Sequence, residues 1–379
     1  MSSPSLVLPC LAAAVQGFAF MNHAPVVPLV MREVGVSPAA AGFLTTATFV
    51  ACGVFSAPLG ALTDRFGPKR VTAAAMLTVV VSAIGFALAP SYPLMLVTRA
   101  LAGVSLASVF VAGGLYVNVH WSGPRQYFAQ GLHGGSILLG IGAGVFLLPG
   151  LGETLGWRVA ILLSAAPAFG VAVVWMLVAR PGTPPVARAS IASVYRSSRI
   201  WRLGIAHTSM FGTSIVLGAW IAVYLTTEFG LSLGYAGVFG SIGLLIGAVG
   251  RPAGGVLVSR GVARPHRLIV ATLAGIVIAL GLLAWPGRPL AVAMLGVVAA
   301  GVATSLGFAP IVTLAGRAAP GAPGAALGLI GLAATFVVII GAPVVGALWS
   351  AFGNFTVPLA VFAVMPATAL ALALGLRSD

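Results

Sequence analysis

Twelve long apolar stretches, separated by short segments that carry nearly all of the charges, run through this 379-residue sequence. Only 6% of the residues are charged and 60% are hydrophobic, whereas about 25% of the residues of a soluble domain are charged. Because even a large soluble domain exposes a wide surface, no core could shield this much apolar surface from water. Since about 20 apolar residues span the hydrocarbon core of a bilayer as a helix, the sequence predicts an all-α membrane protein.

The stretches form two groups of six, and the segment between the groups is rich in Pro, Ser and Arg. The expected spans of the first group are 6–31, 39–62, 70–89, 93–118, 129–150 and 157–179. Those of the second group are 201–227, 234–258, 267–285, 289–315, 323–348 and 355–376. We therefore expect 12 transmembrane helices in two pseudo-symmetric six-helix halves, with domains at 1–179 (N-terminal half), 180–200 (cytoplasmic linker) and 201–379 (C-terminal half).

The basic residues predict the orientation. Fourteen of the 19 Lys and Arg residues follow even-numbered spans, three follow odd-numbered spans and two lie inside spans. Because cytoplasmic loops are enriched in Lys and Arg, both termini and the linker are expected on the cytoplasmic side of an inner (plasma) membrane. This distribution also accounts for the net charge of +14 without a nucleic-acid partner.

The two groups repeat weakly around the loop that follows their second span. SAPLGALTDRFG at 56–67 aligns with RPAGGVLVSRG at 251–261, which places Asp64 opposite Ser259. Internal repeats of this kind are typical of secondary transporters, whose substrate site lies between the repeats near the membrane midplane. The repeat therefore favours a transporter over a membrane-embedded enzyme or sensor.

The first of these loops resembles the motif that transporters of the major facilitator superfamily carry after their second helix. The matching residues are Gly60, Leu62, Asp64, Arg65, Gly67 and Arg70. Arg99 and Gly103 are similar to the R-x-x-x-G pattern of that family's fourth helix. The resemblance implies the major facilitator fold, alternating access and a gate in which Asp64 pairs with Arg65 or with a neighbouring helix end. We call this contact of Asp64 the latch. Since Ser259 replaces the acid in the second half, we expect the latch in the first half only. The alternative is that the loop around Asp64 is a plain solvated turn.

A weaker resemblance covers the nitrate/nitrite and cyanate porters of the same superfamily. The similar stretches are HGGSILLGIGAG in the fifth span, GWR at 156–158, WIAVYLTTEFGLS in the seventh span and GRPAGG in the eighth. Arg251 stands where nitrate porters place the arginine of their eighth span. Ser56 stands where they place the arginine of their second span.

Arg251 is the leading candidate for substrate binding. A charge inside a span costs at least about 2.5 kcal/mol on insertion scales, and the five acids all lie at span ends, in loops or at the terminus. We interpret the substrate's own negative charge as the missing partner, because a guanidinium binds carboxylates and oxyanions through two hydrogen bonds. The alternative is a side chain that reaches toward the interface, which lies roughly 10 Å away along the helix.

Other polar residues of the spans are secondary candidates. Those for substrate binding are Gln16, Asn22, His23, Thr213, Trp220 and Tyr224. Those for coupling are the titratable His23, His133 and His207, together with Arg99, whose role the family resemblance implies. For each of them, packing between helices is the alternative.

Glycines at helical spacing predict close helix packing. Gly140 and Gly144 in the fifth span, and Gly243 and Gly247 in the eighth, each leave one face of their helix without side chains. The family resemblance implies that these two helices pack against each other across the halves. Such faces are compatible with rocking of one half against the other, and equally with static packing.

Taken together, these features predict a secondary active transporter that moves a small anion by alternating access, through proton symport or anion exchange. Efflux of a neutral or amphipathic compound is the alternative, and a non-transporting sensor is a remote one. We expect a monomer in the lipid bilayer with no catalytic residues, no metal site and no cofactor, because the sequence has no acid–base pair at depth, no His/Cys cluster and no phosphate-binding loop.

Overall fold

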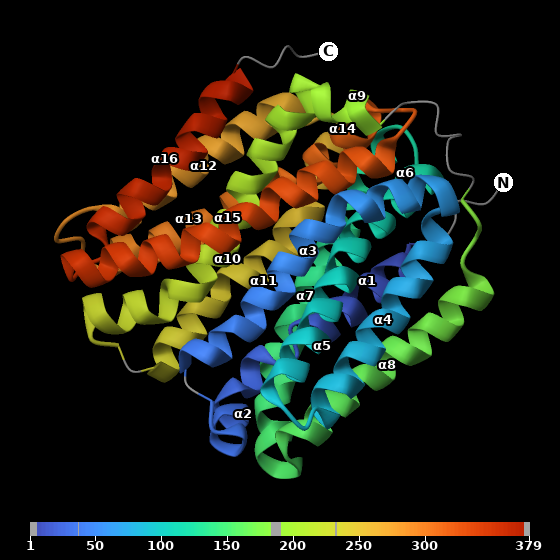
Figure 1. Cartoon of the computed structure of the whole chain (residues 1–379). Coiled ribbons are helices and arrows are strands. Elements are labelled where there is room, and N and C mark those ends of the chain that lie inside the picture. Colours follow the sequence, from blue (N-terminus) through green and yellow to red (C-terminus); the bar gives the residue numbers. More distant parts are fainter. Residues whose placement is uncertain (1–5, 37, 183–190, 232, 375–379) are drawn as a thin grey trace.

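The structure, a computed structural model, contains helices and no strand within the residues that it describes, which are 6–36, 38–182, 191–231 and 233–374. The helices of the first group are α1 (Val7–Phe20), η1 (Ala24–Val26), α2 (Val27–Val34), α3 (Pro38–Phe66), α4 (Pro68–Leu88), α5 (Tyr92–Ser108), η2 (Val109–Gly113), α6 (Gly114–His120), α7 (Pro124–Leu155) and α8 (Trp157–Val178). Those of the second group are α9 (Ile191–Arg196), α10 (Ser198–Phe229), α11 (Leu233–Ser259), α12 (Pro265–Ala284), α13 (Leu290–Leu306), α14 (Phe308–Ala318), α15 (Pro323–Phe352) and α16 (Thr356–Leu374). The predicted all-α fold is confirmed (Figure 1).

Each predicted span coincides with one helix or with two or three helices that follow one another along the chain. Within the described residues, ten of these are long and apolar enough to cross a membrane. α10 adds a bent pair, Ser198–Ile221 and Val223–Phe229, which forms an eleventh crossing if the two parts are one span. α11 contains a shorter apolar helix, Leu245–Ser259. Twelve membrane crossings therefore stay a prediction. In the predicted linker, α9 is a helix that the sequence analysis missed, and 183–190 lie outside the described residues.

The first predicted span, 6–31, is broken near its middle. α1 ends at Phe20, and a turn and the short 3₁₀-helix η1 lead into α2. Pro25 explains the break, because proline lacks an N–H group and its ring clashes with the carbonyl group four residues earlier, here that of Met21. The Ala24 amide donates to Met21 O. The carbonyl oxygen of Phe20 thereby loses its regular helical partner and is free for another donor.

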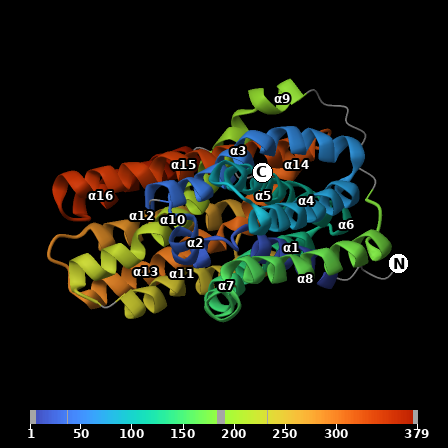
Figure 2. The same cartoon turned by 60° about the horizontal axis from the view of Figure 1, so that its bottom comes forward.

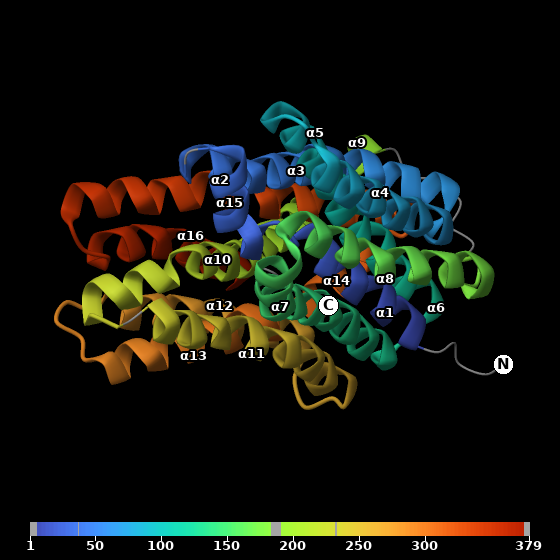
Figure 3. The same ribbon diagram turned by 90° about the horizontal axis from the view of Figure 1, so that it is seen from below.

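Two helix pairs, α3 with α15 and α7 with α11, join the two groups of helices. α1, α4 and α8 lie on one side of these pairs, and α12, α13 and α16 lie on the other (Figures 2 and 3). Buried apolar side chains form two main clusters, one mostly from residues 12–179 and the other mostly from residues 194–373. Separate clusters are what two six-helix halves would produce, and the division into domains stays a prediction.

Glycine brings the backbones of both pairs into close contact. A Cβ atom on Gly131 of α7 would collide with the carbonyl oxygen of Arg251 in α11 and would lie 2.8 Å from the Pro252 Cα. A Cβ atom on Gly60 of α3 would collide with the carbonyl oxygen of Gly324 in α15. The helices approach this closely because no side chain separates them.

The four glycines predicted to pack helices have different neighbours. Gly247 lies against Leu138 of α7, as the packing of the fifth and eighth spans implies. Gly140 and Gly144 instead lie against α1, within the first group of helices. A Cβ atom on Gly243 would meet no atom within 4 Å. The spacing identified smooth helix faces, but spacing alone contains no information about which neighbour a face meets.

Most of the basic residues gather at one end of the bundle. We call this the basic end, and define it as the end at which α3 stops and α4, α7 and α15 begin. The cations there include Arg65, Lys69, Arg70, Arg125 and Arg317. This end is the one that the sequence predicts on the cytoplasmic side.

The opposite end of the bundle carries two ion pairs. Arg158 Nε donates to Glu33 Oε1 at 2.8 Å, and Arg288 Nη2 donates to Glu228 Oε2 at 2.9 Å. The hydrogen bond from Arg158 is the main reason that the pKa of Glu33 lies below its usual value. Both arginines follow odd-numbered spans, and each has its charge compensated by an acid at this end.

We predict that Gly131→Ala destabilises the protein by about 1–3 kcal/mol, because an added methyl group forces α7 and α11 apart or strains their backbones. The measurement is the unfolding temperature of the purified protein in detergent. Gly142→Ala is the matched control on the same helix, where a Cβ atom would meet no atom within 4 Å. Equal unfolding temperatures for the two variants would contradict the close approach.

Candidate functional site

A cavity of about 350 Å³ lies between the two groups of helices. Its wall is formed by α1, η1, α3, α5, η2, α7, α10, α11, α14 and α15. On α3 the lining runs from Thr45 to Ser56, and thus stops about ten residues, or roughly 15 Å, before the basic end. The cavity therefore occupies the middle of the bundle and extends toward the opposite end.

Arg251 of α11 lies at the base of this cavity, and its side chain is only 6% exposed. Its Nη1 donates to the carbonyl oxygen of Gly134 at 2.9 Å, and the guanidinium carbon lies 4.2 Å from the centroid of the Phe308 ring. Its Nε has no hydrogen-bond partner. Among the described residues no carboxylate pairs with it, and no group of His, Cys, Asp and Glu could hold a metal ion. The cavity thus contains a buried cation with a vacant donor.

Aromatic rings surround this cation. His207 stacks on Phe110, with ring centroids 5.0 Å apart, and its ring centroid lies 6.0 Å from that of Phe308. Phe110 and Phe308 meet edge to face at 6.2 Å. The Nδ1 atom of His207 is buried without a hydrogen-bond partner. Of the three candidate histidines, His207 is the one that lines the cavity.

The hydroxyl groups of the cavity wall offer few donors to a ligand. Ser56 Oγ donates to Cys52 O at 2.6 Å, and Thr335 Oγ1 donates to Leu332 O at 2.9 Å. Because a hydroxyl has a single hydrogen to donate, each of these groups presents lone pairs rather than a hydrogen to the cavity. At the base of the cavity an anion would therefore bind chiefly through Arg251, because the other two wall hydroxyl groups, on Thr45 and Ser214, lie farther along α3 and α10.

Asn22 and His23 do not line the cavity; both are fully buried beside Arg99. Arg99 Nη1 donates to Asn22 Oδ1 at 2.9 Å and to the Phe20 carbonyl oxygen at 3.3 Å, the acceptor that the break after α1 leaves free. Arg99 Nη2 donates to Ser82 Oγ at 2.8 Å. Arg99 therefore connects the broken first helix to α4 and α5, and the polar patch predicted to bind substrate serves this connection.

The same network assigns the tautomer of His23. Arg99 Nη1 lies 3.1 Å from His23 Nδ1, and since arginine only donates, Nδ1 is the acceptor. The proton is therefore on Nε2, which lies 3.0 Å from Thr45 Oγ1 and donates to it. Thr45 lines the cavity, so His23 reaches the cavity wall only through this hydroxyl group.

The remaining candidates also lie outside the cavity. Gln16 accepts a hydrogen bond from Ser105 Oγ at 3.2 Å, and Trp220 Nε1 donates to Ala342 O at 3.0 Å. Tyr224 is bonded to Arg288 and Leu283 near the opposite end. Thr213 and His133 are buried, and neither lines the cavity. The structure thus brings together only Arg251 and His207 from the predicted set.

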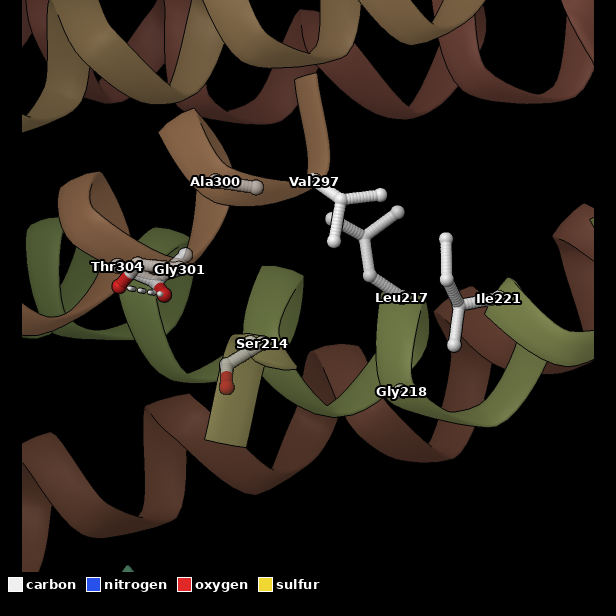
Figure 4. A pocket seen from close by; sticks show the side chains of 9 residues that line it. Ser214, Leu217, Gly218, Ile221, Val297, Ala300, Gly301 and Thr304 are labelled. Atoms are coloured by element: carbon white, nitrogen blue, oxygen red, sulfur yellow. Dashed lines mark hydrogen bonds between the residues drawn. The ribbon is translucent and has the colours of Figure 1, made fainter. Parts of the chain in front are cut away.

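A second cavity, of about 40 Å³, lies between α10, α11 and α13. Figure 4 shows apolar side chains from α10 and α13 around it, with Ser214 and Thr304 at its edge. Thr304 Oγ1 donates to Gly301 O at 3.4 Å. A space this small holds about one water molecule, so we exclude it as a substrate site.

Comparison with known proteins identifies the family. Residues 10–321 match the sequence profile of the Major Facilitator Superfamily. This chain belongs to the Major Facilitator Superfamily. One relative is the "Probable nitrate/nitrite transporter NarK2" of Mycobacterium tuberculosis, which is 25% identical over 72% of this chain and 70% of its own length. The predicted similarity to nitrate/nitrite porters is confirmed, and the chain is a membrane transporter rather than an enzyme.

Solved structures confirm the fold of this transporter. FucP in its outward conformation aligns with a TM-score of 0.79 at 18% identity, over 97% of both chains. The human organic anion transporter MFSD10 aligns with a TM-score of 0.81 at 17% identity, over 97% of this chain and 98% of its own. At such identities the likeness concerns the major facilitator fold alone.

Asp64 of the superfamily motif lies at the N-terminus of α15. Its carboxylate accepts hydrogen bonds from the backbone amides of Gly324 at 2.7 Å and Ala325 at 2.8 Å. Amides of a first helical turn have no partner in their own helix, and the helix dipole favours a negative charge there. Of the two expected partners, Asp64 thus contacts the neighbouring helix end, while Arg65 lies over the Phe66 ring.

The other motif residues have simpler surroundings. Gly67 adopts a φ of +83° where the chain turns into α4, a conformation that favours glycine. Gly60 is the close-contact residue described above, and Leu62 and Arg70 are exposed.

A second contact closes the basic end between α14 and α7. Arg317 Nε and Nη2 donate to Gln126 Oε1 at 3.0 and 2.6 Å. Ser259, which aligns with Asp64 in the repeat, donates to Val256 O in its own helix. The acid latch therefore has no counterpart at Ser259, but Arg317 and Gln126 join the other side of the same end. Sequence analysis missed this pair because 191 positions separate its members.

Sequence analysis also missed the partners of Arg251. Gly134 and Phe308 carry no chemical pattern that would link them to an arginine 117 or 57 positions away. Only the folded structure places these two residues beside Arg251.

The tautomer of His23 leads to a paired prediction. His23→Asn places an amide oxygen near the Nδ1 position and keeps the acceptor for Arg99, whereas His23→Gln places its amide near Nε2 and leaves Arg99 without that acceptor. We expect His23→Gln to lower the unfolding temperature more than His23→Asn, because a buried charged donor loses a partner. Neither variant should change ligand affinity by more than about twofold, since the ring lies outside the cavity. A large loss of affinity with unchanged stability would instead support direct substrate binding.

For the gate, we predict that Asp64→Asn slows transport while leaving ligand affinity largely unchanged. The amide keeps one acceptor but removes the charge that the α15 N-terminus favours, a loss of about 0.5–2 kcal/mol. Turnover in proteoliposomes and ligand affinity of the purified protein are compared with those of Ser259→Ala, the aligned position. Lost affinity with normal turnover would overturn the gating role.

Proposed function

We propose that this transporter moves a small anion across the membrane by alternating access and binds it at Arg251. The observation that carries the proposal is the vacant Nε donor of a guanidinium that is nearly fully buried at the base of the main cavity. A buried cation is strongly stabilised by an opposite charge. A substrate anion supplies that charge, and no described carboxylate does so.

The name of one relative supports an anionic substrate. NarK2 of Mycobacterium tuberculosis, 25% identical, is named a probable nitrate/nitrite transporter. This name suggests an anion for this chain as well. Efflux of a neutral or amphipathic compound is the second candidate, because most of the cavity wall is apolar.

The contacts at the basic end support a cycle of alternating access. Asp64 and Arg317 close that end, while the cavity extends toward the other. We place the basic end, with both termini, on the cytoplasmic side of the inner membrane because of the arginine distribution, so that this conformation is outward-facing. Opening would break the Asp64 and Arg317 contacts while the halves, acting as one monomer, rock at the two helix pairs.

Two modes of coupling fit this cavity, proton symport and anion exchange. His207 is the titratable histidine of the cavity wall, and among the described residues no carboxylate lines that wall. Proton symport would therefore use His207. Exchange would need no titratable group, only a second anion for the return step.

The test of the proposal is the pair Arg251→Lys and Arg251→Gln. We expect Arg251→Gln to weaken anion binding by about 10- to 100-fold, because a hydrogen bond to a charged group contributes about 1.5–3 kcal/mol. Arg251→Lys should retain part of the binding as a point charge without the two-pronged geometry. Binding is measured by the anion-dependent rise of the unfolding temperature, and transport by uptake into proteoliposomes.

Arg260→Gln, at the end of the same helix and exposed at the basic end, is the control for lost positive charge. Transport that survives Arg251→Gln would overturn the anion proposal and favour a neutral substrate. No transport by the wild type, with binding intact, would favour the sensor.

A further inference from the structure

The main cavity has Arg251 and His207 at its base and mostly apolar walls along the rest, with the Thr45 and Ser214 hydroxyl groups farther along. Three helices follow the same order from the base upward. On α3 the order is Ser56, Cys52 and Phe49; on α7 the Arg251 partner Gly134 is followed by Ile137 and Ile141; on α10 it is His207, Phe211 and Ile215. The cavity is therefore amphipathic along its length, with the cation at its closed base.

The size of the cavity exceeds that of a simple inorganic oxyanion. A water molecule takes up about 30 Å³ in the liquid, and the cavity measures about 350 Å³. An ion as small as nitrate at Arg251 would leave most of this space filled with water against apolar side chains. Cavities of this size are typical of organic ligands with an apolar body.

The hydrogen-bond donors of the cavity wall also favour an organic ligand with an apolar body. Every oxygen atom of nitrate carries part of the charge and needs a hydrogen-bond donor or water, whereas the Ser56 and Thr335 hydroxyl groups already donate within their own helices. Oxygens that faced Phe49 or Phe211 would be desolvated without a partner, which is unfavourable. A carboxylate presents both oxygens on one edge and leaves the rest of the molecule apolar. A second carboxylate on the same molecule would face mostly apolar walls, with only the Thr45 and Ser214 hydroxyl groups as donors.

We infer that the substrate of this transporter is an organic monocarboxylate whose compact apolar body occupies the cavity between α3, α7 and α10. This inference rests on the proposed anion function and names the substrate class of that site. The carboxylate binds the guanidinium group of Arg251, and its body contacts Phe49, Ile141 and Phe211. Affinity therefore rises with the apolar surface of the ligand until the cavity is full.

The experiment compares six ligands on the purified full-length chain in lipid nanodiscs, by the rise of unfolding temperature and by calorimetry. The ligands are nitrate, acetate, butyrate, hexanoate, succinate and the neutral hexanamide. We expect hexanoate to bind most tightly, with a gain of about fourfold for each added methylene group, equivalent to about 0.8 kcal/mol. Succinate and nitrate should bind more weakly than butyrate. Counterflow of labelled hexanoate in proteoliposomes tests transport of the same ligand.

A wall variant separates the apolar contact from the charge. Ile141→Thr places a hydroxyl group in the cavity wall and should weaken hexanoate by at least about threefold while changing acetate little. Ile84→Thr, the same substitution at a side chain that is 41% exposed on α4, is the control and should change neither. Arg251→Gln should abolish the difference between hexanoate and hexanamide.

The outcomes distinguish this inference from the proposed function. If nitrate binds as tightly as hexanoate and still depends on Arg251, the monocarboxylate inference fails and anion transport stands. If affinity does not rise along the series from acetate to hexanoate, or Ile141→Thr weakens acetate as much as hexanoate, the inference fails in the same way. If hexanamide binds as well as hexanoate and Arg251→Gln has no effect, both fail.

Discussion

The placement of three buried arginines among apolar helices is the constraint on which the rest of this structure depends. A buried cation is tolerated only where charges, carbonyl oxygens or rings surround it. Arg288 meets Glu228, and Arg99 meets two side chains of the broken first helix, Ser82 and a free carbonyl oxygen. Arg251 has one carbonyl oxygen and one ring.

This difference locates the site. Arg99 and Arg251 both have an Nε atom without a partner, but Arg99 is enclosed by packed side chains and does not line the cavity, whereas Arg251 does. Arg99 thus has a structural explanation that is nearly complete. Arg251 lacks one, and a ligand is the simplest group that would complete its surroundings.

The sequence predicted those features that depend on composition or on single positions. The helices follow from apolar stretches of sufficient length, and Arg251 stood out because it is a charge inside a span. In both cases the local sequence contains the whole physical reason, so the neighbours did not need to be known. For Asp64 the family resemblance, not the local sequence, supplied two possible partners, Arg65 and a neighbouring helix end, and the structure shows the second.

Features that depend on which distant residues meet were not predictable from one sequence. Asn22 and His23 were candidates for substrate binding because, with Gln16, they form a polar patch in the first span, which the family resemblance places along the cavity. The break at Phe20 instead turns both side chains toward Arg99. Glycine spacing likewise identified smooth faces, but Gly140 faces α1 rather than α11.

An unsatisfied Arg251 also bears on how the proposed transport cycle is driven. When the cavity collapses during the change of access, an empty carrier would bury a cation that has one carbonyl oxygen and one ring for partners, whereas a loaded carrier buries a neutral pair. Removing an uncompensated charge from water is far less favourable than removing a paired one. The carrier with a bound anion should therefore change its side of access more readily than the empty carrier. A carrier with this property returns fastest with another anion bound, which favours exchange over symport.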